Sequence, residues 1–342
     1  MITTTHIRRR TLIGLTGLVA VALGMTAYST SAGATASTVT ATAGPAPCAG
    51  GRPYAASSPW NTPIGSSPTI DTRTPAYQKA LTATGTTLTS DVDQYTIGLY
   101  CTTADTPRAT VAFTGYYSDY TTGTRIGHGT APTIPDLPIP TTITPPPGSD
   151  GQIVIWDQNT GIEYGFWQFT WTNGHATATN GYAIRTDTTS TGRFADGLAG
   201  RGAGLPYLAG LVRPAELATG TINHALAFAY PYPSREFTFP ASKSDGKGTT
   251  GTDLPEGTRL QLDPTLTTTD LTNLGVTTTA LPIARALQQY GMYLVDNSGS
   301  AKIYLQDRTS AGWDTTINRT ILGTIPWTRF RAVGPPDLPE AT

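Results

Sequence analysis

The stretch that decides the fold class is Ile153–Trp171, which reads IVIWDQNTGIEYGFWQFTW. Two runs rich in β-branched and aromatic residues flank a short polar segment, and this pattern predicts a β-hairpin. With Asn159 and Thr160 at the centre of the turn, Trp156 lies opposite Glu163. The hairpin therefore has a defined register, from which the composition of each face follows.

The two faces of this hairpin differ in composition, because side chains alternate along a strand and opposed residues share a face. One face is mostly aliphatic and aromatic, which predicts a core face; its residues are Ile153, Ile155, Asp157, Ile162, Tyr164, Phe166, Gln168 and Thr170. The other face carries three of the chain's six tryptophans, in the set Gln152, Val154, Trp156, Glu163, Gly165, Trp167, Phe169 and Trp171.

The tryptophan-bearing face has the composition of a sugar-binding groove. Indole rings supply apolar area, Gln152 and Glu163 bond hydroxyl groups, and Gly165 leaves room for a ring. The alternative is that this face packs under the glycine-rich segment Gly197–Gly210. A register error of one residue would exchange the two faces, so the groove interpretation depends on the turn assignment.

The rest of the chain consists of short β-rich runs separated by Gly, Pro and Asn clusters. This pattern predicts a mostly β, jelly-roll or sandwich-like single domain with one or two accessory helices. The helices are expected at Leu281–Tyr290, which Gly291 ends, and from Pro214 onward. The expected strands are Gln94–Cys101, Ala109–Phe113, Thr221–Phe228 and Thr258–Leu262, with a second hairpin made by Tyr293–Asp296 and Ala301–Leu305.

The first 36 residues have the pattern of an export signal: basic residues, the apolar run Leu12–Ala27 and small residues before Ala36. Arg9 and Arg10 fit a twin-arginine signal, although ordinary secretory signals also carry several arginines. No later apolar run is long enough to span a bilayer, so we expect a soluble, secreted, extracellular protein. The expected order is the signal, a flexible Thr/Pro-rich spacer, a β-rich domain and a loose tail, at 1–36, 37–57, 58–333 and 334–342.

Composition restricts the partners. Charged residues make up 13% of the chain and the net charge is −1, which argues against nucleic acid or an anionic membrane as the main partner. We expect a monomer that acts on an extracellular polysaccharide. The two cysteines, Cys48 and Cys101, would form a disulfide in an oxidising compartment, and two free thiols are the alternative. No metal-ligand spacing or cofactor loop is present, so no metal and no cofactor are expected.

Glycoside hydrolysis is the first candidate reaction, and it requires two carboxyl groups beside the scissile bond. Glu163 is the first choice, because neighbouring tryptophans would desolvate it and raise its pKa. The partner would be Glu216, Asp296 or Asp196, between which the sequence does not choose. For each of these residues the alternative is a structural or solvated carboxylate. The expected substrate-binding residues of this site are Trp156, Trp167, Trp171 and Gln152.

Two other functions stay open. A uronate lyase needs groups that neutralise the substrate's carboxylate and a base that removes a proton, and Arg213, Arg259, Asn223 and His224 offer that chemistry. On a regular strand, however, Asn223 and His224 would point in opposite directions, and His224 would be a core histidine. A non-catalytic glycan-binding protein would use only the tryptophan face. A serine hydrolase is disfavoured, because no G-x-S-x-G segment is present.

Four segments resemble a family of secreted, largely uncharacterised actinobacterial proteins. They are Ala209–Leu217 (AGLVRPAEL), Ile222–Leu226 (INHAL), Pro255–Leu260 (PEGTRL) and Tyr290–Asn297 (YGMYLVDN). The similarity runs from about Ser58 to Phe330, and members are sometimes joined to carbohydrate-related modules. The resemblance implies secretion and an association with polysaccharides, and it fixes no mechanism. Members often have histidine where this chain has Gln152, so a histidine-based role at that position is not expected.

Overall fold

The computed structural model of the protein describes residues 48, 51–115, 117–118, 125–126, 133–194 and 200–334. The side chains of residues 117, 118, 125 and 126 are not part of this description. The expected export signal, most of the expected spacer, Asp196 and the tail beyond Gly334 lie outside the described residues.

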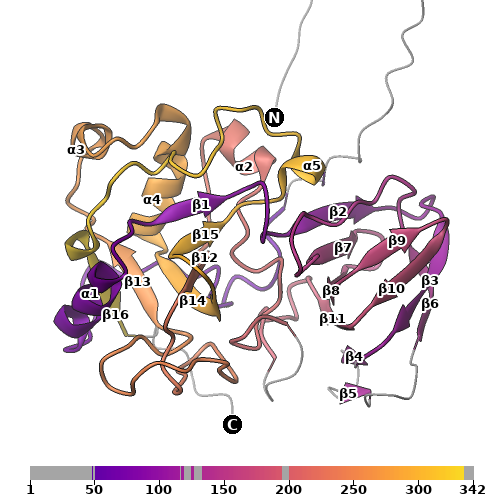
Figure 1. Ribbon diagram of the computed structural model, residues 1–342. Helices are drawn as coiled ribbons and strands as arrows, with labels where there is room; N and C mark the ends of the chain where they lie inside the picture. The colour runs from indigo at the N-terminus through magenta and orange to yellow at the C-terminus, as the bar shows by residue number, and fades with distance from the viewer. Residues whose placement is uncertain are drawn as a thin grey trace, which may run out of the picture. The chain divides into compact units, whose positions relative to one another are not determined.

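One six-stranded sheet, which we call the helix-covered sheet, packs against three helices (Figure 1). In spatial order its strands are β1 (Thr89–Asp91), β15 (Lys302–Tyr304), β12 (Leu226–Tyr230), β14 (Met292–Asn297), β13 (Arg259–Leu262) and β16 (Phe330–Val333). The helices are α1 (Thr74–Ala83), α3 (Thr268–Asn273) and α4 (Leu281–Gln289). Each helix contributes apolar side chains to the core on this face of the sheet.

Alternation along the central strand β12 explains why both faces of this sheet are buried. Leu226 and Phe228 point into the core beneath the helices, whereas Ala227 and Ala229 point into a second core. Large side chains fill the space under the helices, and small ones let other segments approach the opposite face closely.

The remaining strands form two further sheets. The inner sheet has the order β2 (Gly98–Thr102), β7 (Ile153–Asp157), β8 (Ile162–Trp167), β11 (Asn180–Arg185), β4 (Tyr117–Ser118) and β5 (Arg125–Ile126). The outer sheet has the order β6 (Thr133–Pro138), β3 (Arg108–Phe113), β10 (His175–Ala178) and β9 (Thr170–Thr172). A core made from both sheets lies between them, as in a β-sandwich.

The opening hairpin forms β7 and β8 with the predicted register, in which Trp156 pairs with Glu163. Its aliphatic face packs in the sandwich core, as predicted, through Ile153 and Ile155. Its other face is buried as well, because Val154 and Trp156 belong to the second core, which the inner sheet shares with the helix-covered sheet. The hairpin is therefore covered on both faces.

The mostly β, sandwich-like class is confirmed. Helices at Leu281–Gln289 (α4) and Pro214–Thr219 (α2) also form as predicted, with glycines following both. The sequence analysis did not anticipate several short helical segments, which are α1, α3, α5 (Arg308–Ala311), η1 (Thr278–Ala280) and η2 (Trp327–Arg329). No helix among the described residues is long and apolar enough to cross a membrane.

The second predicted hairpin is wrong, although both of its strands exist. Strands β14 and β15 do not pair with each other, because β12 lies between them, parallel to β14 and antiparallel to β15. The predicted strand Thr221–Phe228 also begins later, at Leu226. The connection between β14 and β15 therefore crosses over β12 at one end of the sheet.

The predicted disulfide is confirmed, with a Cα–Cα distance of 5.1 Å between Cys48 and Cys101. It ties the N-terminal segment to strand β2. The expected flexible spacer is too long by several residues, because residues 51–57 belong to the fold. Tyr54 in this segment is buried, and its hydroxyl donates a hydrogen bond to Glu163.

Candidate functional site

A cleft with a volume of about 750 Å³ opens among the described residues. It is formed by the loop after β1, residues Asp150 and Gln152 before β7, the end of β8, the segment 200–207 and the connection between β14 and β15. None of its lining residues comes from the outer sheet. We call it the main cleft.

Aromatic side chains from four separate segments line the main cleft. Tyr95 is 40% exposed, and Trp167 at the end of β8 is partly buried. Tyr207 and Tyr304 are almost fully buried, and the guanidinium of Arg201 lies 4.9 Å from the centre of the Tyr304 ring. Tyr95 and Trp167 thus offer accessible ring area, while the other two rings pack around Arg201.

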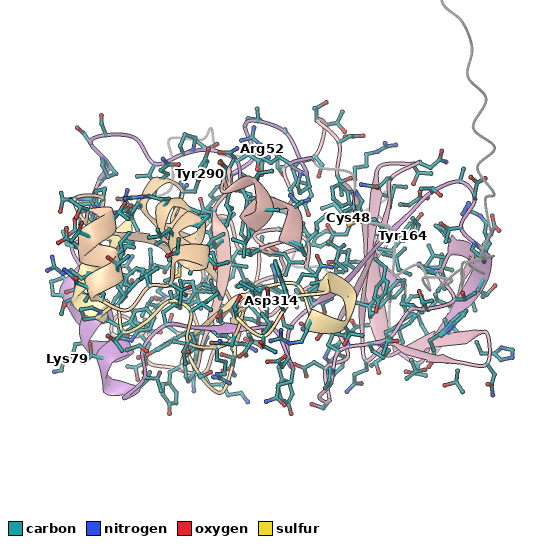
Figure 2. The ribbon with its side chains drawn as sticks, turned by 90° about the horizontal axis from the view of Figure 1, so that it is seen from above. Cys48, Arg52, Lys79, Tyr164, Tyr290 and Asp314 are labelled. Atoms are coloured by element: carbon teal, nitrogen blue, oxygen red, sulfur yellow. A yellow bond between two sulfur atoms is a disulfide. The ribbon has the colours of Figure 1, made fainter. Side chains whose placement is uncertain are left out.

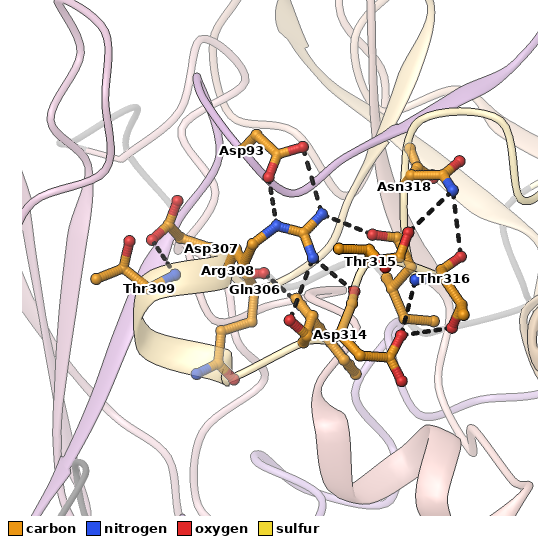
Figure 3. A network of polar contacts seen from close by, with 12 residues as sticks. Asp93, Gln306, Asp307, Arg308, Thr309, Asp314, Thr315, Thr316 and Asn318 are labelled. Carbon is orange, nitrogen blue, oxygen red and sulfur yellow. Dashed lines mark hydrogen bonds and ion pairs between the residues drawn. The ribbon is translucent and has the colours of Figure 1, made fainter.

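The loop that carries Tyr95 is fixed at several points. Lys302 Nζ donates a hydrogen bond of 2.6 Å to the Tyr95 carbonyl and forms an ion pair of 3.1 Å with Asp91. Arg308, at the start of α5, pairs with Asp93 in the same loop and donates to carbonyls of the segment that follows α5 (Figure 3). Tyr95 has a φ of 50°, a left-handed conformation that is unfavourable for tyrosine, and these contacts hold it there.

A cluster of three carboxylates lies at one side of the main cleft. Asp245, Glu256 and Asp296 each have an oxygen within 4.8 Å of the others. Asp245 is exposed and Asp296 is partly buried, and both line the cleft, whereas Glu256 is fully buried behind them. Both the carboxyl group and the backbone N–H of Asp245 lie close to Glu256, but neither Glu256 oxygen makes a hydrogen bond of ordinary geometry with a described residue.

The electrostatics of this cluster disfavour three free negative charges. Burial, together with the charges of Asp245 and Asp296, raises the pKa of Glu256 to about 9. Burial and the charge of Asp245 raise the pKa of Asp296 to about 7, although Arg201 and Lys302 partly oppose this rise. The cluster therefore favours a proton or a cation.

Glu163 does not line this cleft, and its full burial argues against the catalytic role expected from the sequence. Its side chain is fully buried and accepts hydrogen bonds from Tyr54 Oη at 2.6 Å, Tyr182 Oη at 2.7 Å and the Leu208 backbone N–H at 2.9 Å. Burial raises its pKa, and these three donors oppose the rise. The alternative prediction, packing under the glycine-rich segment, describes this face correctly.

The space expected for a sugar beside Gly165 is filled by protein. A Cβ atom added to Gly165 would lie 2.1 Å from Cζ of Tyr182. The glycine thus makes room for the tyrosine ring that donates to Glu163. The groove prediction failed because it assumed that a polar group among aromatics faces solvent.

The three tryptophans of the hairpin go to three different places. Trp167 lines the main cleft together with Gln152. Trp156 is 7% exposed and its Nε1 donates to Thr186 Oγ1 at 2.9 Å, so it is a core residue. Trp171 lies on β9 in the outer sheet and packs against the sandwich core. Gln168 has a φ of 53°, and this left-handed turn after β8 breaks the alternation that the prediction assumed.

Glu216, His224 and Arg213 meet in a second pocket of about 370 Å³. Cys48 and Arg52, labelled in Figure 2, also line it. Glu216 Oε1 accepts hydrogen bonds from Arg213 Nη2 at 2.7 Å and His224 Nε2 at 2.9 Å. Burial opposes its ionisation, but His224 and Arg213 outweigh burial and hold its pKa at about 2.

This second pocket does not combine with the main cleft. Glu216 lines the second pocket and Asp296 lines the main cleft. Neither residue is among the hydrogen-bond partners of Glu163, which are Tyr54, Tyr182 and Leu208. Neither expected carboxylate pair with Glu163 therefore exists. All three polar partners in the second pocket satisfy one another, which indicates a structural ion network at the start of α2.

The expected lyase residues are divided as well. Arg259 is almost fully buried and donates to the carbonyls of Tyr290 and Thr62, so it braces the backbone and does not line the second pocket. Asn223 and His224 do line one pocket, because residues 221–225 do not form a regular strand. The strand-based argument that they point apart is wrong.

Asp245 and Glu256 are the site residues that the sequence analysis missed. Glu256 stands in the PEGTRL segment and Asp296 in the YGMYLVDN segment, two of the four that carry the family resemblance. Asp245 lies in the polar loop after Pro240, where a solvated carboxylate is the ordinary interpretation.

Comparison of the chain with protein-family models, with curated proteins and with solved structures found no match.

Proposed function

We propose that this protein binds an extracellular polysaccharide in the main cleft. The observation that carries the proposal is the pairing of accessible aromatic rings, Tyr95 and Trp167, with a polar lining that contains the amides of Gln152, Asn180 and Asn297. Sugar rings present apolar faces to aromatic side chains and hydroxyl groups to amides and carboxylates. A volume of about 750 Å³ is within the range of small-ligand sites, on the order of 300 to 1,000 Å³.

The position of the aromatic rings also supports a ligand that extends along the cleft. Tyr95 belongs to the loop after β1, and Trp167 ends strand β8 of the inner sheet. Both are held by backbone contacts, since Tyr95 N–H donates to Pro147 and the Trp167 carbonyl accepts from Thr179. Rings fixed before binding cost little conformational entropy when a sugar stacks on them.

Affinity electrophoresis against soluble plant, algal and actinobacterial cell-wall glycans, followed by titration calorimetry with the retained glycan, tests this proposal. Trp167→Ala and Tyr95→Ala should each weaken binding about fivefold, because one stacking contact contributes roughly 1 kcal/mol. Tyr232→Ala is the matched control, since Tyr232 is 58% exposed and does not line the cleft. Retention of no glycan, or equal loss in all three variants, would contradict the proposal.

Hydrolysis of the bound glycan is the second candidate function. Asp245 and Asp296 both face the main cleft, and their oxygens lie within 4.8 Å of each other. In retaining glycosidases the two carboxyl groups are about 5 Å apart, one acting as nucleophile and the other as acid and then base. This pair replaces the expected pairs that contained Glu163.

Product analysis separates hydrolysis from binding alone. If the pair is catalytic, the wild-type protein releases saccharides with new reducing ends and no double bond, and Asp245→Asn and Asp296→Asn stop release without loss of binding. A product with an unsaturated uronate would instead indicate elimination. Binding without products would leave the protein as a glycan-binding protein.

Secretion is part of this proposal. The disulfide between Cys48 and Cys101 is compatible with an oxidising compartment, and the N-terminal pattern is that of an export signal. Expression in an actinobacterial host should place the protein in the culture medium. Replacement of both Arg9 and Arg10 by lysine should block export through the twin-arginine route and leave ordinary secretion intact.

A further inference from the structure

We propose that Asp245, Glu256 and Asp296 form a binding site for a hard divalent cation, best suited to Ca²⁺, at the side of the main cleft. The proposal goes beyond glycan binding and does not depend on which glycan the cleft takes. It rests on the positions of the three carboxylates, on the burial of Glu256 and on the close approach of the Gly202 backbone.

The spacing of the carboxylates fits one shared ion. Oxygens from all three residues lie within 4.8 Å of one another. A Ca²⁺ ion holds its oxygen ligands at about 2.3 to 2.6 Å, so two ligands of the same ion are at most about 5 Å apart. The donor set contains only carboxylate oxygens, which favours Ca²⁺ or Mg²⁺ over zinc or copper.

Glu256 supplies an independent reason for a ligand at this position. Its side chain has no exposed area, and neither of its carboxylate oxygens has a hydrogen-bond partner among the described residues. No ion pair of the described residues includes Glu256, Asp245 or Asp296. Buried carboxylates are ordinarily paired or bound to a metal, and Glu256 points toward the other two acidic side chains.

Gly202 shapes the site from the opposite side. A Cβ atom added there would lie 2.6 Å from Asp245 Oδ1 and 2.8 Å from Glu256 Oε1. The Gly202 N–H also donates a hydrogen bond of 3.2 Å to Asp296 Oδ1. One glycine thus contacts all three acidic side chains and leaves their oxygens room to converge.

The cluster also borders the main cleft, which leaves part of an ion's coordination shell open. Asp245 and Asp296 line the cleft, and Glu256 closes the site from within the protein. Three carboxylates provide at most six oxygens, and Ca²⁺ takes six to eight ligands, so water or a sugar hydroxyl completes the shell from the cleft side. A cation at this position would therefore be open to the cleft, where a glycan bound as proposed can reach it directly or through water.

Calorimetric titration of the chelator-treated full-length protein with CaCl₂, and separately with MgCl₂ and MnCl₂, tests the site. We expect saturable binding of one Ca²⁺ per chain and a rise in melting temperature that EDTA reverses. Asp245→Asn and Glu256→Gln should each lower Ca²⁺ affinity at least tenfold. Asp150→Asn is the control, because it removes a cleft carboxylate outside the cluster and should change affinity less than twofold.

A charge-neutral variant keeps the test independent of lost carboxylates. Gly202→Ala preserves all three acids but places a methyl group between them, so it should also lower Ca²⁺ affinity. The absence of saturable binding of any of the three metals to the wild-type protein overturns the proposal. Equal Ca²⁺ affinity in Asp245→Asn, a variant of an exposed residue, overturns it as well.

The same experiments distinguish this site from the hydrolytic pair. If Asp245 and Asp296 are cation ligands, EDTA or Asp296→Asn should weaken glycan binding. If Asp296→Asn abolishes glycan cleavage while Ca²⁺ affinity and glycan binding stay unchanged, the pair performs acid–base chemistry and the cation site is refuted. Trp167→Ala should weaken glycan binding and leave Ca²⁺ affinity unchanged. This variant therefore tests the glycan proposal separately from the cation site.

Discussion

Replacement of Glu163 by leucine should destabilise the fold without removing a catalytic group. The carboxylate accepts hydrogen bonds from Tyr54, Tyr182 and Leu208, at 2.6, 2.7 and 2.9 Å, in a fully buried position. Leucine would leave these three donors without a partner, and each buried orphaned donor costs about 1 to 3 kcal/mol. Removal of the buried charge offsets part of this cost, so we expect a loss of about 4 kcal/mol in the free energy of unfolding.

Glutamine should be tolerated better at this position. Its amide oxygen still accepts two hydrogen bonds, and its amide nitrogen can donate to Tyr54 Oη, which accepts no hydrogen bond from another described residue. We therefore expect Glu163→Gln to cost about 1 to 2 kcal/mol, close to the loss of one hydrogen bond to a charged group. The matched control is Glu236→Gln at an exposed position, which should change stability by less than about 0.5 kcal/mol.

Urea denaturation followed by tryptophan fluorescence measures these differences, and glycan binding is measured on the fraction that remains folded. We expect a large loss of stability for Glu163→Leu and unchanged glycan affinity per folded molecule for Glu163→Gln. If Glu163→Gln abolishes binding or cleavage while stability stays at the wild-type value, Glu163 acts on substrate and the structural role is refuted.

Three further predictions concern stability and the cleft. Reduction of the disulfide between Cys48 and Cys101, which are 53 residues apart, should cost about 4 kcal/mol by the chain-entropy estimate and lower the melting temperature in dithiothreitol, whereas a double-serine variant should not respond to the reductant. Glu216 has a pKa of about 2 in the folded protein against an ordinary value of 4.5, so its ionisation contributes roughly 3 kcal/mol to the free energy of unfolding. This contribution is complete above pH 4.5 and is lost as the pH falls toward 2. An acid-denaturation profile should be flatter over this range in Glu216→Gln, and an unchanged profile would contradict the ion network. Arg308→Ala removes the ion pair with Asp93, so the Tyr95 loop should become less ordered and glycan binding should weaken severalfold. Arg285→Ala, a control outside that loop, should leave glycan affinity unchanged in the same titration.

The parts of the fold that local chemistry decides were predictable. The pairing of Trp156 with Glu163 follows from one short turn, and helix α4 follows from its apolar spacing and the glycine after it. The pairing of β14 and β15 was not predictable in this way, because β12, far earlier in the chain, inserts between them. Sequence proximity favours a hairpin, and only the long-range core contacts of β12 override it.

The site residues also divide into those that local sequence predicts and those that only the tertiary fold brings together. Trp167, Gln152 and Asp296 were expected at a binding site and do line the main cleft. Glu163 was misplaced because its partners, Tyr54 and Leu208, come from segments that no local pattern connects with the hairpin. Asp245 and Glu256 carry no periodic signal of their own, and only the tertiary fold brings them to Asp296.

The hydrogen bonds of Glu163 also have a mechanical consequence for the cleft. Glu163 belongs to strand β8, which ends at Trp167 in one wall of the cleft. It accepts a hydrogen bond from Leu208, which follows the segment with Arg201 in the opposite wall. Separation of these two walls would leave the Glu163 carboxylate buried without its donors, which costs free energy and opposes an opening motion. These hydrogen bonds therefore limit changes in the width of the cleft, and a glycan bound there as proposed would be selected by its thickness and branching.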